Sequence, residues 1–307
     1  MVSRTHAAVQ SLVSRVLVTG ALGNVGREVV RECEARGLEV RAALRDPIED
    51  AKQLSGTETV AFDFLDRRTW EKAVLGCDAL FLLRPPPIGD METTLCPFVD
   101  VAYAAGVTHV VFLSVAGADR MKWVPHRKVE LHLEKTGKPW TLLRPGFFAQ
   151  NLQDAYRKDI VEDDRIYVPA GEGRVAFVDV RDIASVTAHV LASPEAFRSQ
   201  ALTLTGPEAL PFTAVTETLT AVLGRSIRYE AATIPGYAWH LRTKRNMAWM
   251  QIAVQTILHV GLRGGDAERV DSTVERLLGR PARNLADYVR ESAATWSSRA
   301  RVGEGIP

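Results

Sequence analysis

Short apolar runs alternate with amphipathic stretches along the first 145 residues of the 307-residue chain. The runs have the length of buried strands, and the stretches between them place apolar residues at helical spacing. They predict strands at residues 15–18, 38–44, 58–61, 79–83, 107–113 and 141–144. They predict helices at residues 27–36, 48–54, 67–75, 91–105 and 126–136. This alternation predicts an α/β fold in which helices cover both faces of a mostly parallel sheet, the doubly wound or Rossmann fold.

The pattern changes after Pro145. We predict a strand at 175–178, a helix at 179–191, and a last strand at 201–204 that returns to the main sheet. A further strand, 227–231, lies in an otherwise helical C-terminal part. The predicted organisation is a leader at 1–14, a Rossmann domain at 15–146 and 174–206, and a smaller, mainly helical lobe at 147–173 and 207–300.

A glycine-rich turn links the first strand to the first helix. Residues 16–26 read V-L-V-T-G-A-L-G-N-V-G, with Gly20, Gly23 and Gly26 three residues apart. Such a turn brings bare backbone and a helix N-terminus to a pyrophosphate. It therefore predicts a dinucleotide cofactor bound by Gly20, Leu22, Gly23, Asn24, Val25 and Gly26.

Composition excludes several other classes of protein. The net charge is +1, which gives no sign of a nucleic-acid partner. No apolar run approaches the ~20 residues that cross a bilayer. Cys33, Cys77 and Cys96 lack metal-ligand spacing, so we expect no metal site but reduced, mostly buried thiols. A cytoplasmic location follows as an expectation.

The end of the second strand bears on cofactor preference. An acidic residue at this place takes the ribose hydroxyls of NAD, whereas an arginine accommodates the 2′-phosphate of NADP. Here Arg45 follows the strand and Arg41 lies within it, which favours NADP(H). Asp46 follows Arg45 and could serve the ribose, so NAD(H) remains the alternative.

Ligands of doubly wound sheets bind at the carboxyl ends of the strands. The loops after the later strands should therefore line the site. We predict cofactor contacts from Leu83, Arg84, Pro85, Ser114, His126 and Pro145. Arg84 could meet a phosphate or an anionic substrate, although its proline-rich loop also suits a simple connector.

Three further motifs accompany the glycine turn: L-R-P-G-F-F at 143–148, F-V-D-V-R-D-I-A at 177–184 and G-R-P-A-R at 279–283. With them the chain resembles the NmrA-like group of atypical short-chain dehydrogenase/reductases (SDR). That group holds quinone reductases, isoflavone-type reductases, ergot-alkaloid iminium reductases and redox-sensing regulators. The resemblance implies an NAD(P)-binding oxidoreductase or regulator. Asp63 and Phe64 resemble the group's adenine-contacting pair, although Asp63 could equally cap a helix.

One departure from the wider family concerns catalysis. Short-chain dehydrogenases usually carry Tyr-x-x-x-Lys on the helix after the fifth strand, and the tyrosine gives a proton to the nascent alkoxide. Here Lys122 and His126 occupy those places, so the dyad is absent. Acceptors that need no tyrosine acid follow: a quinone, a ketone beside its own phenol, or an iminium ion.

Two residues remain as catalytic candidates. His126 follows Pro125, which suits a helix start, and could hold the nicotinamide ribose or donate a proton, with Glu130 one turn later to orient it. A half-buried histidine beside a surface carboxylate is the alternative. Ser114 ends the fifth strand and could bind substrate, or could cap the next turn.

The substrate side is predicted from aromatic residues. Phe147, Phe148 and Asn151 follow the sixth strand and should meet a flat substrate, although Phe equally fills cores. Trp239 and Met247 lie in an aromatic stretch that suits a lid over a bulky ligand, with core or a dimer interface as alternatives. We expect a monomer or homodimer.

The predicted function is hydride transfer from NAD(P)H to an activated acceptor on a bulky aromatic molecule. Arginine far outnumbers lysine, which hints at a GC-rich genome and at tailoring of an aromatic polyketide in secondary metabolism. A reduced quinone could then react with oxygen, giving net hydroxylation. The alternative is a non-catalytic NAD(P)-sensing regulator that binds a protein partner.

Overall fold

The apolar runs form a seven-stranded sheet in the structure, a computed structural model that describes residues 13–54, 56–121 and 123–297. The predicted leader, 1–14, lies outside the described residues except for its last two, and Lys122 lies outside them too. The strands are β1 (Arg15–Val18), β2 (Glu39–Leu44), β3 (Glu58–Ala61), β4 (Ala79–Leu83), β5 (His109–Leu113), β6 (Trp140–Pro145) and β9 (Gln200–Leu204). Their order is β3-β2-β1-β4-β5-β6-β9, and the neighbouring pairs from β3 through β6 run parallel. The predicted fold class is confirmed, and the order reverses between β1 and β4.

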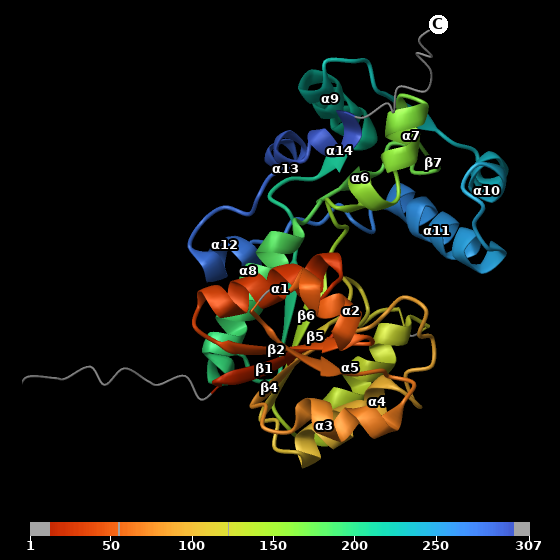
Figure 1. Cartoon of the computed structure of the whole chain (residues 1–307). Coiled ribbons are helices and arrows are strands. Elements are labelled where there is room, and N and C mark those ends of the chain that lie inside the picture. The colour runs from red at the N-terminus through yellow and green to blue at the C-terminus, as the bar shows by residue number, and fades with distance from the viewer. Residues whose placement is uncertain (1–12, 55, 122, 298–307) are drawn as a thin grey trace, which may run out of the picture. The chain divides into compact units, whose positions relative to one another are not determined.

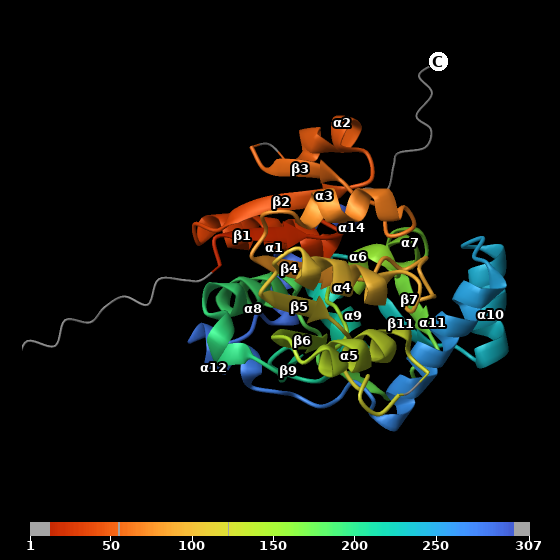
Figure 2. The ribbon, with the colours of Figure 1, turned by 90° about the horizontal axis from the view of Figure 1, so that it is seen from below.

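Helices cover both faces of this sheet (Figures 1 and 2). On one face lie α1 (Asn24–Ala35) and α8 (Val180–Ala192), which the Ser185 hydroxyl joins by donating to Glu32 Oε2 at 3.1 Å. The other face carries α3 (Trp70–Val74), α4 (Leu95–Ala104) and α5 (Pro125–Thr136). Trp70 and Phe98 pack there against Leu80 and Phe112 of the strands. Burial of both faces explains why these strands read as continuous apolar runs.

Shorter helices complete the connections. They are α2 (Pro47–Asp50) and the 3₁₀ helices η1 (Ala51–Gln53), η2 (Arg67–Thr69), η3 (Pro194–Phe197) and η4 (Leu262–Gly264).

The described chain divides into two compact units. The first unit runs to Pro145 and takes in Ile183–Thr203, and the second holds Gly146–Asp182 and the described residues from Leu204 onward. The chain therefore passes between units three times, once inside α8 and once inside β9. Residues 174–182, which the sequence pattern assigned to the Rossmann domain, group with the second unit.

The second unit is mainly helical, as its sequence indicates. Its helices are α6 (Asn151–Asp154), α7 (Arg157–Glu162), α9 (Phe212–Leu223), α10 (Ile234–Thr243), α11 (Trp249–Gly261), α12 (Thr273–Leu278), α13 (Leu285–Glu291) and α14 (Ala294–Ser297). Its core gathers large aromatic side chains such as Tyr156, Phe177, Phe212 and Trp296.

Two strand assignments in the second unit differ from expectation. The strand predicted at 175–178 is reduced to β8 (Arg174–Val175), which pairs antiparallel with β10 (Leu210–Pro211) outside the main sheet. Phe177 and Val178 are buried without joining a strand. The sequence pattern missed β7 (Arg165–Val168), whose parallel partner β11 (Arg228–Ala231) lies some sixty residues later. Only two of its four residues are buried, so its apolar signal is weak.

The three cysteines are free and buried, as predicted. Burial raises the pKa of Cys33 to about 12 and that of Cys96 to about 11, so both thiols stay protonated. Within the described residues, no helix combines the length and the apolarity needed to span a membrane.

Candidate functional site

Thr19, just before the glycine turn, is hydrogen-bonded to the neighbouring strand β4. Its backbone N–H donates to the Phe81 carbonyl at 3.1 Å, and the Leu83 N–H donates to its hydroxyl at 2.8 Å. The carboxyl ends of β1 and β4 are thereby held together at the point where the strand order reverses. This is where such sheets bind their ligands.

The turn has no room for a side chain at Gly20 or Gly26. Gly20 has φ +66°, and a Cβ on it would lie 3.0 Å from the Leu83 side chain. A Cβ on Gly26 would lie 2.0 Å from the Gly20 carbonyl oxygen. Helix α1 begins directly after Gly23, and no side chain caps its N-terminus. A bare cradle at an uncapped helix start fits a pyrophosphate, because the anion can take the backbone N–H groups.

The remaining predicted residues of this turn divide by exposure. Gly23 and Asn24 are exposed, Leu22 is partly buried, and Val25 packs inward with the apolar face of α1. Cofactor contacts from Leu22, Asn24 and Val25 remain predictions.

The end of β2 offers one arginine rather than two. Arg41 is buried, donates from Nε to Glu58 at 2.7 Å and from Nη1 to the Leu75 carbonyl at 2.6 Å. Its predicted availability to a phosphate is wrong, because a buried cation takes the nearest carboxylate. Arg45 is exposed. Asp46 accepts the Ile48 and Glu49 N–H groups at the start of α2, so its carboxylate is engaged as a cap.

Asp63 and Phe64 follow β3, and the structure separates their roles. Asp63 Oδ1 accepts the Leu65 N–H at 2.8 Å in a local turn, while Asp66 is the residue that caps the following helix. The Phe64 ring is buried against Phe62 and Phe98, with ring centroids 4.7 and 5.6 Å away. The Phe64 ring is thus held in the core, whereas Asp63 keeps its side chain nearer the surface. Contacts of the two residues with adenine remain predictions.

Arg84 is fixed to its own loop. Its Nη1 donates to the carbonyls of Ile88 at 2.5 Å and Pro86 at 3.1 Å, and its Nε donates to His126 Nε2 at 3.4 Å. Pro85 is partly buried in the same loop. The guanidinium therefore stabilises the proline-rich loop that follows β4.

His126 lies in the first turn of α5, which begins at Pro125 as predicted. Burial and the Arg84 charge lower its pKa to about 4, despite an opposing contribution from Glu130. Its Nδ1 is buried without a hydrogen-bond partner among the described residues. Burial and the neighbouring guanidinium therefore favour the neutral ring at neutral pH, and a catalytic role for His126 remains a prediction.

Glu130 does not hydrogen-bond to His126, contrary to the expectation that it would orient the imidazole. It is fully buried and accepts from the Ser114 hydroxyl at 2.6 Å, from Arg144 Nε and Nη2, each at 2.9 Å, and from Arg127 Nη1 at 2.9 Å. Burial opposes its ionisation, but the hydrogen bonds from Arg144, Ser114 and Arg127 outweigh it and lower its pKa. A buried carboxylate needs cations more than a neutral ring.

This network also changes the picture of Ser114. The residue is buried rather than exposed at an edge, and its hydroxyl proton is committed to Glu130. Only its oxygen lone pairs remain to receive a hydrogen bond. Arg144, which sequence analysis missed as a site residue, holds this carboxylate and precedes Pro145, whose carbonyl accepts the Ala116 N–H at 2.8 Å. The L-R-P-G-F-F motif was the signal that marked it.

The predicted substrate residues belong to the second unit. Phe147 is partly buried, edge-on to Phe177 and His259 at 5.9 Å each, and Phe148 forms an isolated bridge with Val178. The other three predicted substrate residues lie elsewhere in this unit. Asn151 begins α6, Met247 packs against the core, and Trp239 on α10 is 69 % exposed. Their contacts with a substrate remain predictions.

Asp182 explains two of the motifs. It is fully buried and accepts the Arg283 backbone N–H and Arg280 Nη2, each at 2.7 Å. The motifs at 177–184 and 279–283 thus meet in one ionic contact inside the second unit.

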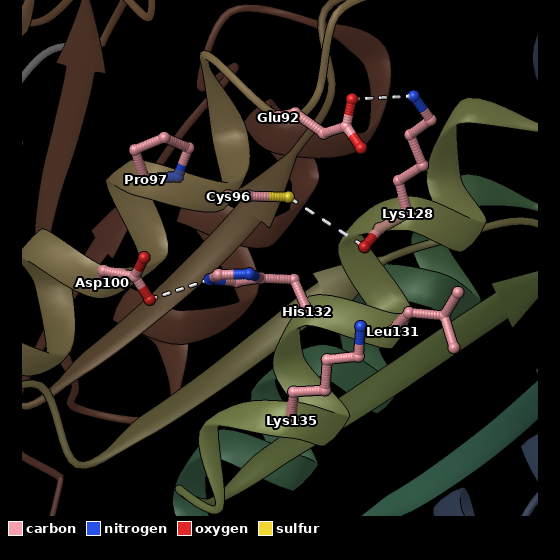
Figure 3. A pocket seen from close by; sticks show the side chains of 8 residues that line it. All are labelled: Glu92, Cys96, Pro97, Asp100, Lys128, Leu131, His132 and Lys135. Carbon is pink, nitrogen blue, oxygen red and sulfur yellow. Dashed lines mark hydrogen bonds and ion pairs between the residues drawn. The ribbon is translucent and has the colours of Figure 1, made fainter.

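A pocket of about 290 Å³ lies on the first unit between α4 and α5 (Figure 3). Across it Lys128 pairs with Glu92 at 3.1 Å and His132 with Asp100 at 2.8 Å. None of the predicted site residues lines it. It is a surface hollow beside these two side-chain pairs, separate from the strand ends. Among the described residues no group of three or more His, Cys, Asp or Glu side chains could hold a metal ion.

Comparison with known proteins agrees with this geometry. A sequence model of the NmrA-like family matches residues 13–254. The chain is 32 % identical over 291 residues to an NAD(P)H azoreductase of Xenophilus azovorans, which covers 92 % of this chain and 99 % of that protein. It is 32 % identical over 249 residues to an agroclavine dehydrogenase of Claviceps fusiformis, covering 78 % and 84 %. Its fold matches the NADPH-dependent quinone oxidoreductase of Escherichia coli with a TM-score of 0.80, at 24 % identity over 90 % of this chain and 99 % of that one.

Proposed function

Because this chain belongs to the NmrA-like family of atypical short-chain dehydrogenase/reductases, we propose that it transfers hydride to an activated acceptor on a bulky aromatic molecule. The chain is an NAD(P)H-dependent reductase. The acceptor classes we propose are a quinone, a hydroxy-aryl ketone or an iminium ion.

The observation that carries the proposal is the protonation of the site. Arg84 Nε faces His126 Nε2 at 3.4 Å, burial and this cation lower the pKa of the histidine, and the Ser114 proton is committed to Glu130. Neither side chain is set to hand a proton to an alkoxide. An acceptor whose new charge spreads over a ring, or which starts as a cation, needs no such acid and can take any proton from water.

The residues of the first unit have separate tasks in this proposal. The turn from Gly20 to Gly26 would bind the pyrophosphate of NAD(P)H through backbone N–H groups, and Arg45 would bind the 2′-phosphate. When bound, NAD(P)H supplies the hydride. The Leu83–Pro85 loop would form a rigid wall at the nicotinamide, and Ser114 would accept a hydrogen bond. Arg45 is exposed and the Asp46 carboxylate is engaged in capping α2, which supports a preference for NADPH.

We further propose that the natural acceptor is an aromatic polyketide and that a reduced quinone reacts onward with oxygen. The arginine-rich composition supports the first part. The second follows from the chemistry of hydroquinones, which give electrons to oxygen. The names of two relatives, an NAD(P)H azoreductase and an agroclavine dehydrogenase, support a small organic molecule as the acceptor.

The test is loss of NADPH absorbance with a panel of quinones, polycyclic hydroxy-ketones and iminium compounds, each with and without oxygen. We expect turnover of at least one class without oxygen. Gly26→Ala, which blocks the cradle, should abolish most of it, and Gly89→Ala is the matched control. If NADPH binds and none of the panel consumes it, the hydride-transfer proposal is overturned in favour of an NAD(P)-sensing regulator.

A further inference from the structure

Arg84 and His126 lie side by side in the first unit, and the pair determines where the imidazole carries its hydrogen. The two nitrogens, Arg84 Nε and His126 Nε2, are 3.4 Å apart. An arginine Nε only donates, so Nε2 must accept. A neutral imidazole that accepts at Nε2 carries its hydrogen on Nδ1. That Nδ1 is buried and has no partner among the described residues, so a donor is left over.

The cation in this pair is stationary. Arg84 Nη1 is anchored on the carbonyls of Pro86 and Ile88, and three consecutive prolines, at 85–87, restrict the loop. A guanidinium does not lose its charge in a protein. The histidine therefore always faces a positive group at the same place.

The other surroundings of His126 also favour the neutral ring. The second charged group facing it is Glu130 on the same helix, and that carboxylate is already matched by Arg144 and Arg127. From β5 the apolar ring of Phe112 lies 6.1 Å away. The residue sits in the first turn of a twelve-residue helix, whose dipole opposes a positive charge there.

We propose that Arg84 is a positioning residue that fixes His126 as a neutral hydrogen-bond donor through Nδ1, offered to an oxygen of the bound reactants. This rests on the proposed function. The oxygen is either a ribose hydroxyl of NAD(P)H or the carbonyl oxygen of the acceptor. In both cases the N–H stabilises partial negative charge without giving up its proton. An unpaired buried donor costs stability in the free protein, which binding of that oxygen would recover.

The first experiment needs no turnover. In protein labelled with ¹⁵N-histidine and free of cofactor, the ring nitrogens of His126 should show a hydrogen on Nδ1 and stay neutral from about pH 5.5 to 8. In Arg84→Met the same ring should lose its single tautomer and titrate nearer the ordinary value of about 6.5. A hydrogen on Nε2 in the unaltered protein, or an unchanged spectrum in Arg84→Met, would overturn the proposal.

Two controls test whether the change in the His126 signals is specific to the loss of Arg84. Arg68→Met removes an exposed arginine of the same unit, paired with Asp66 at 2.8 Å, and should leave the His126 signals in place. His132, six residues along α5 and partly exposed, is the internal reference in every spectrum. A matching thermal melt for Arg84→Met shows that the spectrum reports the ring and not unfolding.

A second experiment identifies the oxygen. His126→Phe removes the donor, and His126→Asn returns an amide near the Nδ1 position. If the recipient is the ribose, His126→Phe should weaken NADPH binding about tenfold and His126→Asn should restore most of it. If it is the acceptor, the Kd for NADPH stays and kcat/KM for the acceptor falls about tenfold. If neither changes, the donor role is overturned. Failure to find any acceptor defeats the proposed function alone, because the spectra and NADPH titrations do not depend on it.

Discussion

The start of α5 in the first unit and the helix pair α10–α11 in the second both bury histidines, but they satisfy them differently. In the second unit His240 Nε2 meets Asp159 at 2.9 Å, and His259 is bonded on both sides, to the Tyr156 hydroxyl at 2.6 Å and the Gln255 carbonyl at 2.7 Å. In the first unit His126 meets a cation and keeps one nitrogen unpaired.

This difference separates packing from function. Buried polar groups are normally hydrogen-bonded within the protein, because leaving one unpaired lowers the stability by about 1–3 kcal/mol. The second unit follows this rule at these two histidines, so they stabilise a fold. The unpaired nitrogen of the first unit lies at the strand ends where ligands bind, which is where such a cost is tolerated.

The largest expected effect comes from breaking a pair in the second unit. Asp159→Asn removes the charge that holds His240 and Arg245, and should lower the free energy of unfolding by about 3–5 kcal/mol. Urea unfolding followed by tryptophan fluorescence measures it. Asp163→Asn, on a partly exposed neighbour, should cost less than about 1 kcal/mol. A weakened NADPH affinity with unchanged stability would break the comparison.

Acid should weaken the protein through its buried histidines. Burial holds the pKa of His109, His126 and His259 at about 4 in the folded chain, below the unfolded value of about 6.5. The unfolded chain therefore binds more protons, so stability is complete above pH 6.5 and is lost as the pH falls toward 4. For His259 alone the loss at pH 4.5 is about 2 kcal/mol.

Unfolding midpoints measured from pH 7 to 4.5 test this dependence. His259→Gln should flatten the curve, since it removes one titrating ring and keeps an amide near the Tyr156 hydroxyl. His132→Gln, at a partly exposed histidine of the first unit, is the matched control. An identical slope in His259→Gln would mean that this ring is not held neutral.

Closing the glycine cradle should weaken both folding and cofactor binding. Gly26→Ala places a methyl group against the Gly20 carbonyl, and such overpacking costs about 1–3 kcal/mol. If the turn binds the cofactor, NADPH affinity should fall about tenfold to a hundredfold by fluorescence titration. Gly89→Ala, where an added Cβ meets nothing within 4 Å, is the matched control. Equal affinity in both variants would remove the turn from the cofactor site.

The smallest effect sharpens the cofactor preference. Arg45→Ala should weaken NADPH binding about tenfold and leave NADH binding unchanged, because only NADPH carries the 2′-phosphate. Titration of both nucleotides measures the ratio. Arg68→Ala serves as a control for loss of one exposed positive charge. A parallel loss for NADH would place Arg45 elsewhere.

The parts of the fold that sequence predicted well are those whose signal is local. Strands β3 and β4 coincide with their predicted ranges, and the glycine turn follows β1 as expected. Strand β7 was missed because it is only four residues long and buries only two of them, which leaves a weak apolar signal.

The site shows the same limit at the level of side chains. Helical spacing correctly put Glu130 one turn after His126. The Glu130 carboxylate nevertheless pairs with Arg144, which lies fourteen residues later on β6. The His126 imidazole instead accepts a hydrogen bond from Arg84, which lies forty-two residues earlier in the chain. Arg41 looked available for a phosphate and pairs with Glu58 on the adjoining strand. The partner of a buried charged side chain depends on the order of the strands in the sheet. The spacing of residues along the chain does not predict that order.

The three passages of the chain between the units also decide how the protein can be taken apart. A fragment that stops at Pro145 would lose β9 and α8, leaving β6 as an open edge and one sheet face partly bare. Such edges recruit other chains. A hybrid that borrows the second unit from a relative must therefore be spliced at three junctions, 145/146, 182/183 and 203/204, with the middle one inside a continuous helix.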